Sequence, residues 1–135
     1  MLNDINSILK DLLPINLKSK IDFLIQGNED NATKTIIVRL VSSEEKPTTS
    51  GDIPFVKYVY SCIFIGEKAK LKIQEEDTKV LLEEAFNAFN LKKNLTKNDT
   101  TVTQILCNNM KFDGIDDSRN IVHSFNINII AYKNN

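Results

Sequence analysis

The chain has 135 residues, of which 41% are hydrophobic and 26% are charged, and its formal net charge is −1. This length and balance predict a single globular domain, residues 1–135, that buries its core without disulfide bonds or metal ions. A nearly neutral chain has no general electrostatic attraction to nucleic acid or to membranes, so the composition disfavours a basic DNA-binding domain. No apolar run approaches the roughly 20 residues that span a bilayer, and the start, Met1–Asp4, lacks the features of a signal peptide. We therefore expect a protein that is made and used inside a cell.

The side chains that carry chemistry in other proteins form no catalytic or metal-binding pattern here. Cys62 and Cys107 lie in apolar, strand-like runs, where a free thiol behaves as a small hydrophobic side chain, and we expect both to be buried. The one histidine, His123, falls on the inward period of a strand, which favours a core or interface residue over a general base. The sequence thus predicts no enzyme and no cofactor, and it indicates no catalytic, cofactor-binding or metal-binding residues.

A cluster of acidic residues lies near the C-terminal end of the chain. It comprises Asp113, Asp116 and Asp117. Their spacing does not match a calcium-binding loop. We expect a solvated turn at this position.

The first expected element is an amphipathic helix that ends at Pro14. Asn3 or Asp4 is available as a polar residue near its start. The apolar residues at helical spacing are Leu2, Ile5, Ile8, Leu9, Leu12 and Leu13. Because its polar face carries charges of mixed sign, packing on a sheet is favoured over contact with a membrane or with a partner helix.

Two strands and a long loop are expected next. Lys20–Gln26 alternates weakly and reads as a short strand, and Thr35–Ser42 is rich in β-branched residues and reads as a second. Residues 43–54 contain two prolines and a glycine and have no apolar period. We expect this segment to be a mobile loop, either a hairpin tip or a segment that becomes ordered on a partner.

Phe55–Phe64 is apolar on both faces, as is typical of a central strand that is covered on both sides. Ile65-Gly66 allows a bend or bulge, after which an alternating pattern predicts that the strand continues. This continuation places Lys68, Lys70 and Lys72 on one face. A solvated face is favoured there over contact with phosphate groups.

Lys79–Lys93 carries a helical period, with acidic residues before it and lysines at its end. Its apolar residues include Leu82, Phe86 and Phe89, so the helix is expected to lie across the sheet. A turn at Asn94–Asp99 and a strand at Thr100–Leu106, ended by Asn108-Asn109, follow.

The clearest strand begins at Ile121, after a polar turn at Asp113–Asn120. Its odd positions are mostly apolar and its even positions carry Ser124, Asn126 and Asn128, which is the pattern of a half-buried strand. The elements together predict an α+β fold: one mostly antiparallel or mixed β-sheet of four to five strands, with an N-terminal helix and one long helix packed on it.

This order of elements resembles the tail terminator and minor capsid (tail-completion) proteins of long-tailed bacteriophages and prophage-derived particles. The matching residues are Gly114, Asp116 and Asp117 in the last turn and the aromatic-Asn pair Phe125-Asn126 in the last strand. The chain departs from the family pattern in two places. It has Leu13-Pro14 after the first helix, where an aromatic-Pro step is frequent, and Ser42-Ser43 where a Thr-Gly-Gly-like end often follows the early strand.

The resemblance implies a structural protein that forms a homohexameric ring, caps the tail tube, stops its polymerisation and joins the tail to the head connector. Its partners would be copies of itself, the tail tube protein and the connector proteins, with DNA only passing through the ring and no membrane involved. The resemblance also implies assembly in the cytoplasm of the host bacterium and a place in the tail or neck of the virion. The alternatives are another neck or head-completion protein, or a small-ligand or lipid-binding α+β domain with a pocket between helix and sheet.

Overall fold

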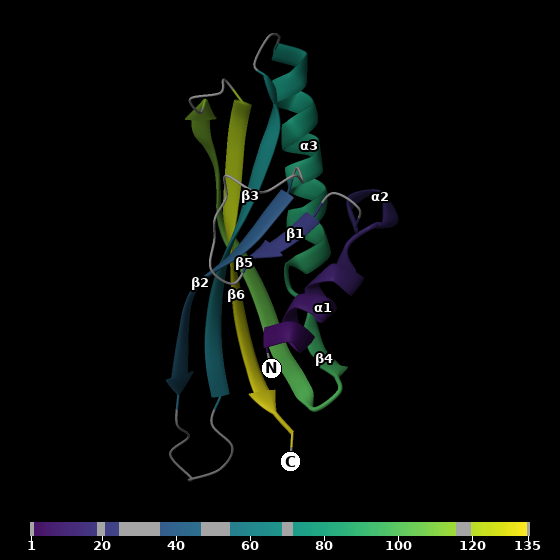
Figure 1. Ribbon diagram of the computed structural model, residues 1–135, viewed down its shortest axis with the longest axis vertical. Helices are drawn as coiled ribbons and strands as arrows, with labels where there is room; N and C mark the ends of the chain where they lie inside the picture. The colour runs from purple at the N-terminus through teal and green to yellow at the C-terminus, as the bar shows by residue number, and fades with distance from the viewer. Residues whose placement is uncertain are drawn as a thin grey trace.

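A computed structural model of the chain describes residues 2–18, 21–24, 36–46, 55–68, 72–115 and 120–134. It confirms the α+β class, with helices and one sheet in a single layered arrangement (Figure 1). The elements in chain order are α1 (Leu2–Leu12), α2 (Ile15–Lys18), β1 (Ile21–Leu24), β2 (Ile36–Lys46), β3 (Phe55–Lys68), α3 (Lys72–Phe89), β4 (Lys93–Lys97), β5 (Thr100–Ile115) and β6 (Asn120–Lys133).

The sheet has six strands in the order β1-β2-β3-β6-β5-β4. β1 is parallel to β2, and all the other neighbouring strands are antiparallel. The strand pairs β2–β3 and β5–β6 are joined through β3 and β6 at the middle of the sheet. The expectation of a mixed, mostly antiparallel sheet is therefore confirmed.

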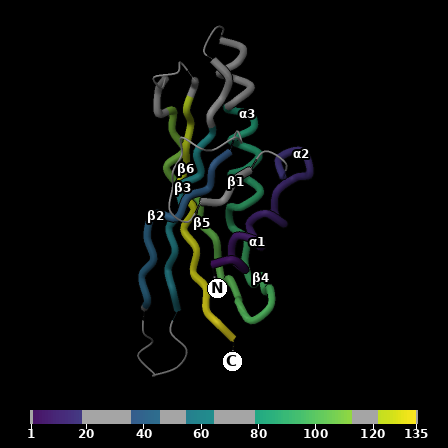
Figure 2. Tube along the Cα trace, viewed as in Figure 1, coloured from purple at the N-terminus to yellow at the C-terminus, as the bar shows by residue number. Residues whose placement is uncertain are grey.

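Helices α1 and α3 lie on one face of this sheet, with the long α3 running beside the strands (Figures 1 and 2). On α1 the side chains of Ile5, Ile8 and Leu9 are buried, which confirms that its apolar stripe packs on the sheet. The buried sheet residues of this core are Ile36, Val38, Tyr58, Tyr60, Cys62, Phe64, Val102, Ile105, Cys107, Phe125, Ile127, Ile129 and Ala131. Alternate residues of the central strands thus form the floor of the core, as the period of two predicts.

Helix α3 begins earlier and ends earlier than its sequence pattern predicted. It starts at Lys72, so Lys72 and Ile73 belong to a helix and not to a continued strand, and the predicted lysine stripe is wrong there. β3 itself reaches Lys68 after the register shift expected near Gly66, whereas Lys70 lies outside the described residues. At the other end, Leu91 takes a positive φ of 62° and turns the chain into β4. Lys93, which was predicted to end the helix, therefore begins β4.

The remaining differences concern polar segments that form strands. Ser43–Lys46, predicted as part of a loop, extends β2 by pairing with β3, while residues 47–54 lie outside the described part of the chain. Most of the predicted turn Asn94–Asp99 is β4, a sixth strand, which pairs with the first residues of β5. Asn108-Asn109 does not end β5, because a positive φ at Asn109 allows a bulge and the strand continues to Ile115. The predicted turn Asp113–Asn120 is therefore wrong at its ends, where residues 113–115 belong to β5 and Asn120 begins β6. In each case pairing with a neighbouring strand outweighs a low intrinsic strand propensity.

Candidate interaction surfaces

The histidine and both cysteines are buried residues. His123 is 5% exposed, and its ring centroid lies 5.0 Å from that of Phe112. Cys62 and Cys107 are free, buried thiols, as expected. Burial raises the pKa of Cys62 and raises the pKa of Cys107 to about 12, which disfavours the reactive thiolate. These thiols therefore act as packing groups.

Two further findings concern the described residues only. Within them, no group of three or more His, Cys, Asp or Glu side chains is placed to hold a metal ion. None of their helices has the length and apolar character that crossing a bilayer requires.

The residues that carry the family resemblance lie in the last two strands. Phe125 is fully buried beneath α3, with ring centroids 5.2 Å from Phe86 and 6.4 Å from Phe89. Asn126 is the neighbour of Phe125 on β6 and lies on the opposite face of the sheet, paired with Ser61 and Asn108. Gly114 is part of β5 and pairs with Val122, and Asp116 and Asp117 lie outside the described residues.

We call the sheet surface opposite α1 and α3 the open face. Its register places mixed rows of side chains across four strands, for example Leu106, Asn128, Val59 and Ser42. Asn128 donates from Nδ2 to the carbonyl oxygen of Leu106 at 3.1 Å, and Thr103 donates from Oγ1 to that of Ile130 at 3.0 Å. These polar side chains of the open face thus form hydrogen bonds within the sheet. Apolar side chains of the same face, namely Val59, Ile63 and Ile130, are half-buried.

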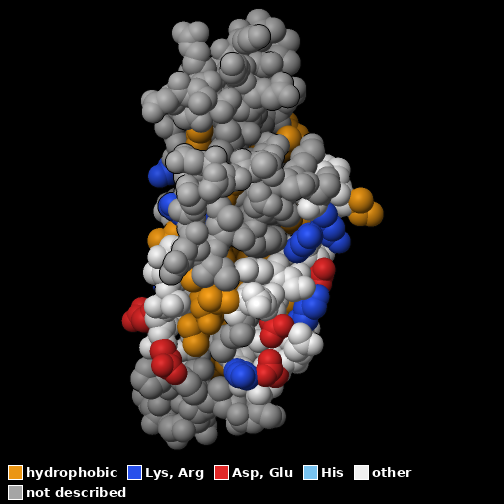
Figure 3. All heavy atoms as spheres, in the orientation of Figure 1, with side chains coloured by type: hydrophobic (Ala, Val, Ile, Leu, Met, Phe, Trp, Pro, Cys, Tyr) orange, Lys and Arg blue, Asp and Glu red, His pale blue; other side chains and the backbone are white. Residues whose placement is uncertain are grey.

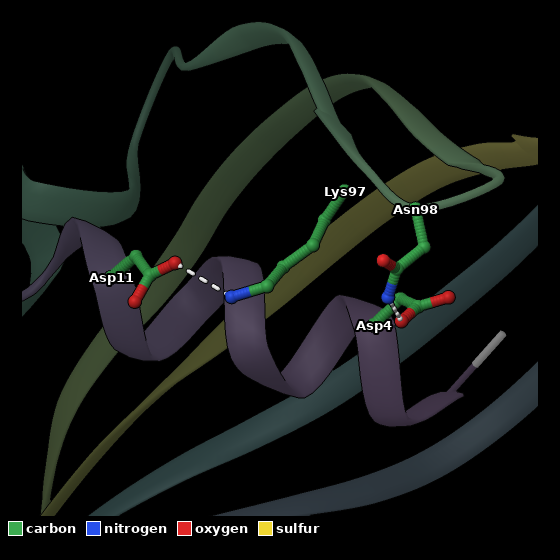
Figure 4. A network of polar contacts seen from close by, with 4 residues as sticks. All are labelled: Asp4, Asp11, Lys97 and Asn98. Atoms are coloured by element: carbon green, nitrogen blue, oxygen red, sulfur yellow. Dashed lines mark hydrogen bonds and ion pairs between the residues drawn. The ribbon is translucent and has the colours of Figure 1, made fainter.

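A polar cluster fixes α1 to the hairpin of β4 and β5 (Figure 4). Asp4 accepts hydrogen bonds from Asn98 Nδ2 at 2.8 Å and from Thr100 Oγ1 at 3.0 Å. Asp11 forms an ion pair with Lys97 at 3.1 Å. In Figure 3, acidic and basic side chains alternate over the lower right of the view, beside α1 and β4. This surface presents no single sign of charge to a partner.

Large apolar side chains are exposed at a few places in the described part of the chain. Four of them belong to β5 or to the turn before β4: Leu91 (64% exposed), Leu106 (42%), Met110 (38%) and Phe112 (49%). Ile15, at the start of α2, and Val41, on β2, are also exposed. Sequence reasoning missed the β5 group, because it ended the strand at Asn108 and placed Leu91 inside a helix. The alternation resumed by Met110, Lys111 and Phe112 was the available signal.

Comparisons with known proteins add little to these observations. No protein-family model matches the sequence, and no curated protein matches it. Among solved structures, the fold is similar to a chain of the virion of a native gene transfer agent (GTA) particle. The TM-score is 0.46 at 10% sequence identity, and the match covers 96% of this chain and 86% of that chain.

Proposed function

We propose that the protein is a structural component of a phage or prophage-like tail. It forms a ring that caps the tail tube, stops the polymerisation of the tube and joins the tail to the head connector. The supporting observation is the position of β6 at the middle of the sheet: Phe125 lies beneath α3 and Asn126 lies on the open face. This is the helix-on-sheet arrangement around a last strand with an aromatic-Asn pair that the sequence resemblance implies.

The surfaces support a role in assembly. Exposed apolar side chains lie along β5 and on β2, where they are available for contacts with other proteins. The partners in this proposal are further copies of the chain, the tail tube protein and the head-tail connector proteins. The number of copies, six, follows from the symmetry of the tube in the family that the sequence resembles. The protein has no catalytic activity of its own and needs no cofactor, and DNA passes through the ring without specific recognition.

The ligand-binding alternative requires space between α3 and the sheet. Leu82, Phe89 and Phe125 occupy that layer, and each is fully buried by its neighbours. The α3–sheet interface is thus a filled core at these positions, which favours a structural role over a pocket.

The test uses purified protein and tubes assembled from the tube protein of the same particle. A ring should appear at one end of each tube in electron micrographs, and the tubes should stop lengthening. Tubes that lengthen at an unchanged rate with bare ends would overturn the tail-terminator role. Binding to isolated head connectors without any effect on tubes would instead identify another neck or head-completion protein.

A further inference from the structure

The edge of the sheet beside β5 is only partly occupied. β4 pairs with Thr100–Gln104 of β5. The turn before β4 continues this cover by a short distance, because Leu91 N donates to Ile105 O at 2.9 Å and Cys107 N donates to Asn90 Oδ1 at 2.9 Å. From Asn108 to Phe112, no strand of the described part of the chain pairs with β5 on this side. We call Asn108–Phe112 the β5 edge.

The β5 edge is exposed along its length and has apolar side chains on it and beside it. Met110 and Phe112 lie within it, and Leu91 and Leu106 lie where the cover ends. Leu91 has a φ of 62°, a conformation that a branched side chain adopts only at a cost. A half-empty strand edge with apolar side chains is a template for pairing with another strand.

The opposite edge of the sheet has a matching gap. β1 pairs with Ile36–Arg39 of β2. From Leu40 to Lys46, no described strand pairs with β2 on the β1 side. We call Leu40–Lys46 the β2 edge. It exposes Val41, at 56%, and the carboxylates of Glu44 and Glu45.

The two edges lie on opposite sides of the sheet and at different positions along the strand direction. On its other side, the β2 segment that carries the β2 edge pairs with Phe55–Tyr60 of β3. These β3 residues lie beside Ile127–Ala131 of β6. The β5 edge lies beside His123–Asn126, which is nearer the start of β6. A second copy that is shifted along the strand direction can therefore place its β2 edge against the β5 edge of the first copy. In this arrangement β4 of the first copy lies beyond one end of the contact, and β1 of the second copy lies beyond the other end.

The strand directions also agree with such a contact. Each step from β2 to β3, β6 and β5 reverses direction, so β2 and β5 are antiparallel within one chain. In a second copy of the same orientation, β2 would thus run antiparallel to β5 of the first and continue the alternation. Antiparallel pairing would place Glu44 and Glu45 toward the end of the β5 edge that adjoins Lys92 and Lys93. It would place Val41 toward Phe112.

We propose that the β5 edge of one protomer pairs with the β2 edge of a second copy, so that one sheet continues from subunit to subunit. This is a heterologous contact, in which each protomer uses two different surfaces, and repetition of such a contact closes a ring when the rotation between neighbours permits it. The inference specifies the subunit interface of the ring proposed above and rests on that proposal. The occupant of each edge is a neighbouring copy of this chain.

Cysteine cross-linking tests the contact with full-length protein. One sample carries Asn108→Cys and a second carries Glu45→Cys; the native thiols are buried and do not compete. Under mild oxidation, the mixed samples should form a covalent dimer, both at tube ends and at high concentration without tubes. Each variant alone should not, because a heterologous contact does not bring like edges together. A matched control mixes Asn108→Cys with Glu83→Cys, on the exposed side of α3, and should stay monomeric.

Dimers formed by either variant alone would show an isologous contact and overturn the proposal. So would the absence of mixed dimers in both conditions. Mixed dimers without any ring on tubes would support the edge contact while overturning the tail-capping function. The failures of the two proposals are thus distinguishable.

A second variant tests the contact without cysteine chemistry. Val41→Lys places a charge on the β2 edge, where Val41 is 56% exposed, and Val80→Lys places one on α3, where Val80 is 53% exposed. Both proteins should fold, since neither side chain is buried. Val41→Lys should lose ring formation and mixed cross-linking, whereas Val80→Lys should keep both. Equal rings from both variants would overturn the assignment of the β2 edge.

Discussion

Asp4 illustrates how single residues connect distant parts of the chain. The hydrogen bond from Asn98, as the main cause, and that from Thr100, as the next, lower the pKa of its carboxyl group below the ordinary value of 3.8. The carboxylate therefore binds a proton less readily in the folded protein than in the unfolded chain. Its contribution to stability is present above the unfolded pKa and is lost as the pH falls through the lower, folded pKa.

This linkage predicts that Asp4→Asn weakens the acid dependence of folding. The unfolding midpoint of the wild-type protein should fall as the pH is lowered below about 4, and the fall should be smaller in the variant. Urea titrations between neutral pH and acid would measure both midpoints. Identical pH dependence in the two proteins would show that the Asn98 and Thr100 contacts do not stabilise the carboxylate.

The two thiols give a second prediction at this scale. Because burial raises the pKa of both groups, Cys62 and Cys107 should resist a thiol-specific reagent at neutral pH. Both should react when the protein is unfolded in denaturant. Rapid labelling under native conditions would show that β3 or β5 opens readily.

Elements differ in how fully sequence patterns determine them. α1 and β6 were predicted well, because a single strong period decides which of their side chains face the core, as at Ile5 and Phe125. β3 was predicted to be covered on both sides, but the described helices cover one face only, and Val59 and Ile63 on the other face are half-buried. β4 and the second half of β5 were missed, since their polar residues have low strand propensity and form strands only because they pair with the next strand of the chain. The unpaired parts of β2 and β5 were also missed, because they are defined by the lengths of the neighbouring strands β1 and β4, which no local pattern contains.

Helix α3 should depend on one aromatic anchor. Phe89 is fully buried and contacts Phe125, so Phe89→Ala is expected to cost about 3–5 kcal/mol of unfolding free energy. Val80 lies on the same helix and is 53% exposed, so Val80→Ala should change stability by less than about 0.5 kcal/mol. Chemical denaturation of both variants measures the difference. Similar losses would mean that the face of α3 against the sheet is assigned incorrectly.

Helix α1 is held by both polar and apolar contacts, and their magnitudes differ. Leu9 is fully buried, and its replacement by Ala should cost about 2–5 kcal/mol. The ion pair of Asp11 and Lys97 is solvent-exposed, so Lys97→Ala should cost less than about 1 kcal/mol. A larger loss from Lys97→Ala than from Leu9→Ala, in the same denaturant titration, would contradict this order.

At the scale of the whole molecule, the buried residues of α1, α3 and the sheet form one continuous cluster. No part of this core is independent of the others, so unfolding should be cooperative. Urea transitions followed by tyrosine fluorescence and by far-ultraviolet circular dichroism should coincide. A separate early transition would indicate that α1 or the β2–β3 hairpin unfolds independently.

The central position of β6 has a consequence for the synthesis of the protein. Among the described strands β6 is synthesised last, yet it lies between β3 and β5 and pairs with both. Until β6 has been synthesised, β2–β3 and β4–β5 lack the strand that lies between them in the folded sheet. The six-stranded sheet can therefore form only after β6 has left the exit tunnel of the ribosome.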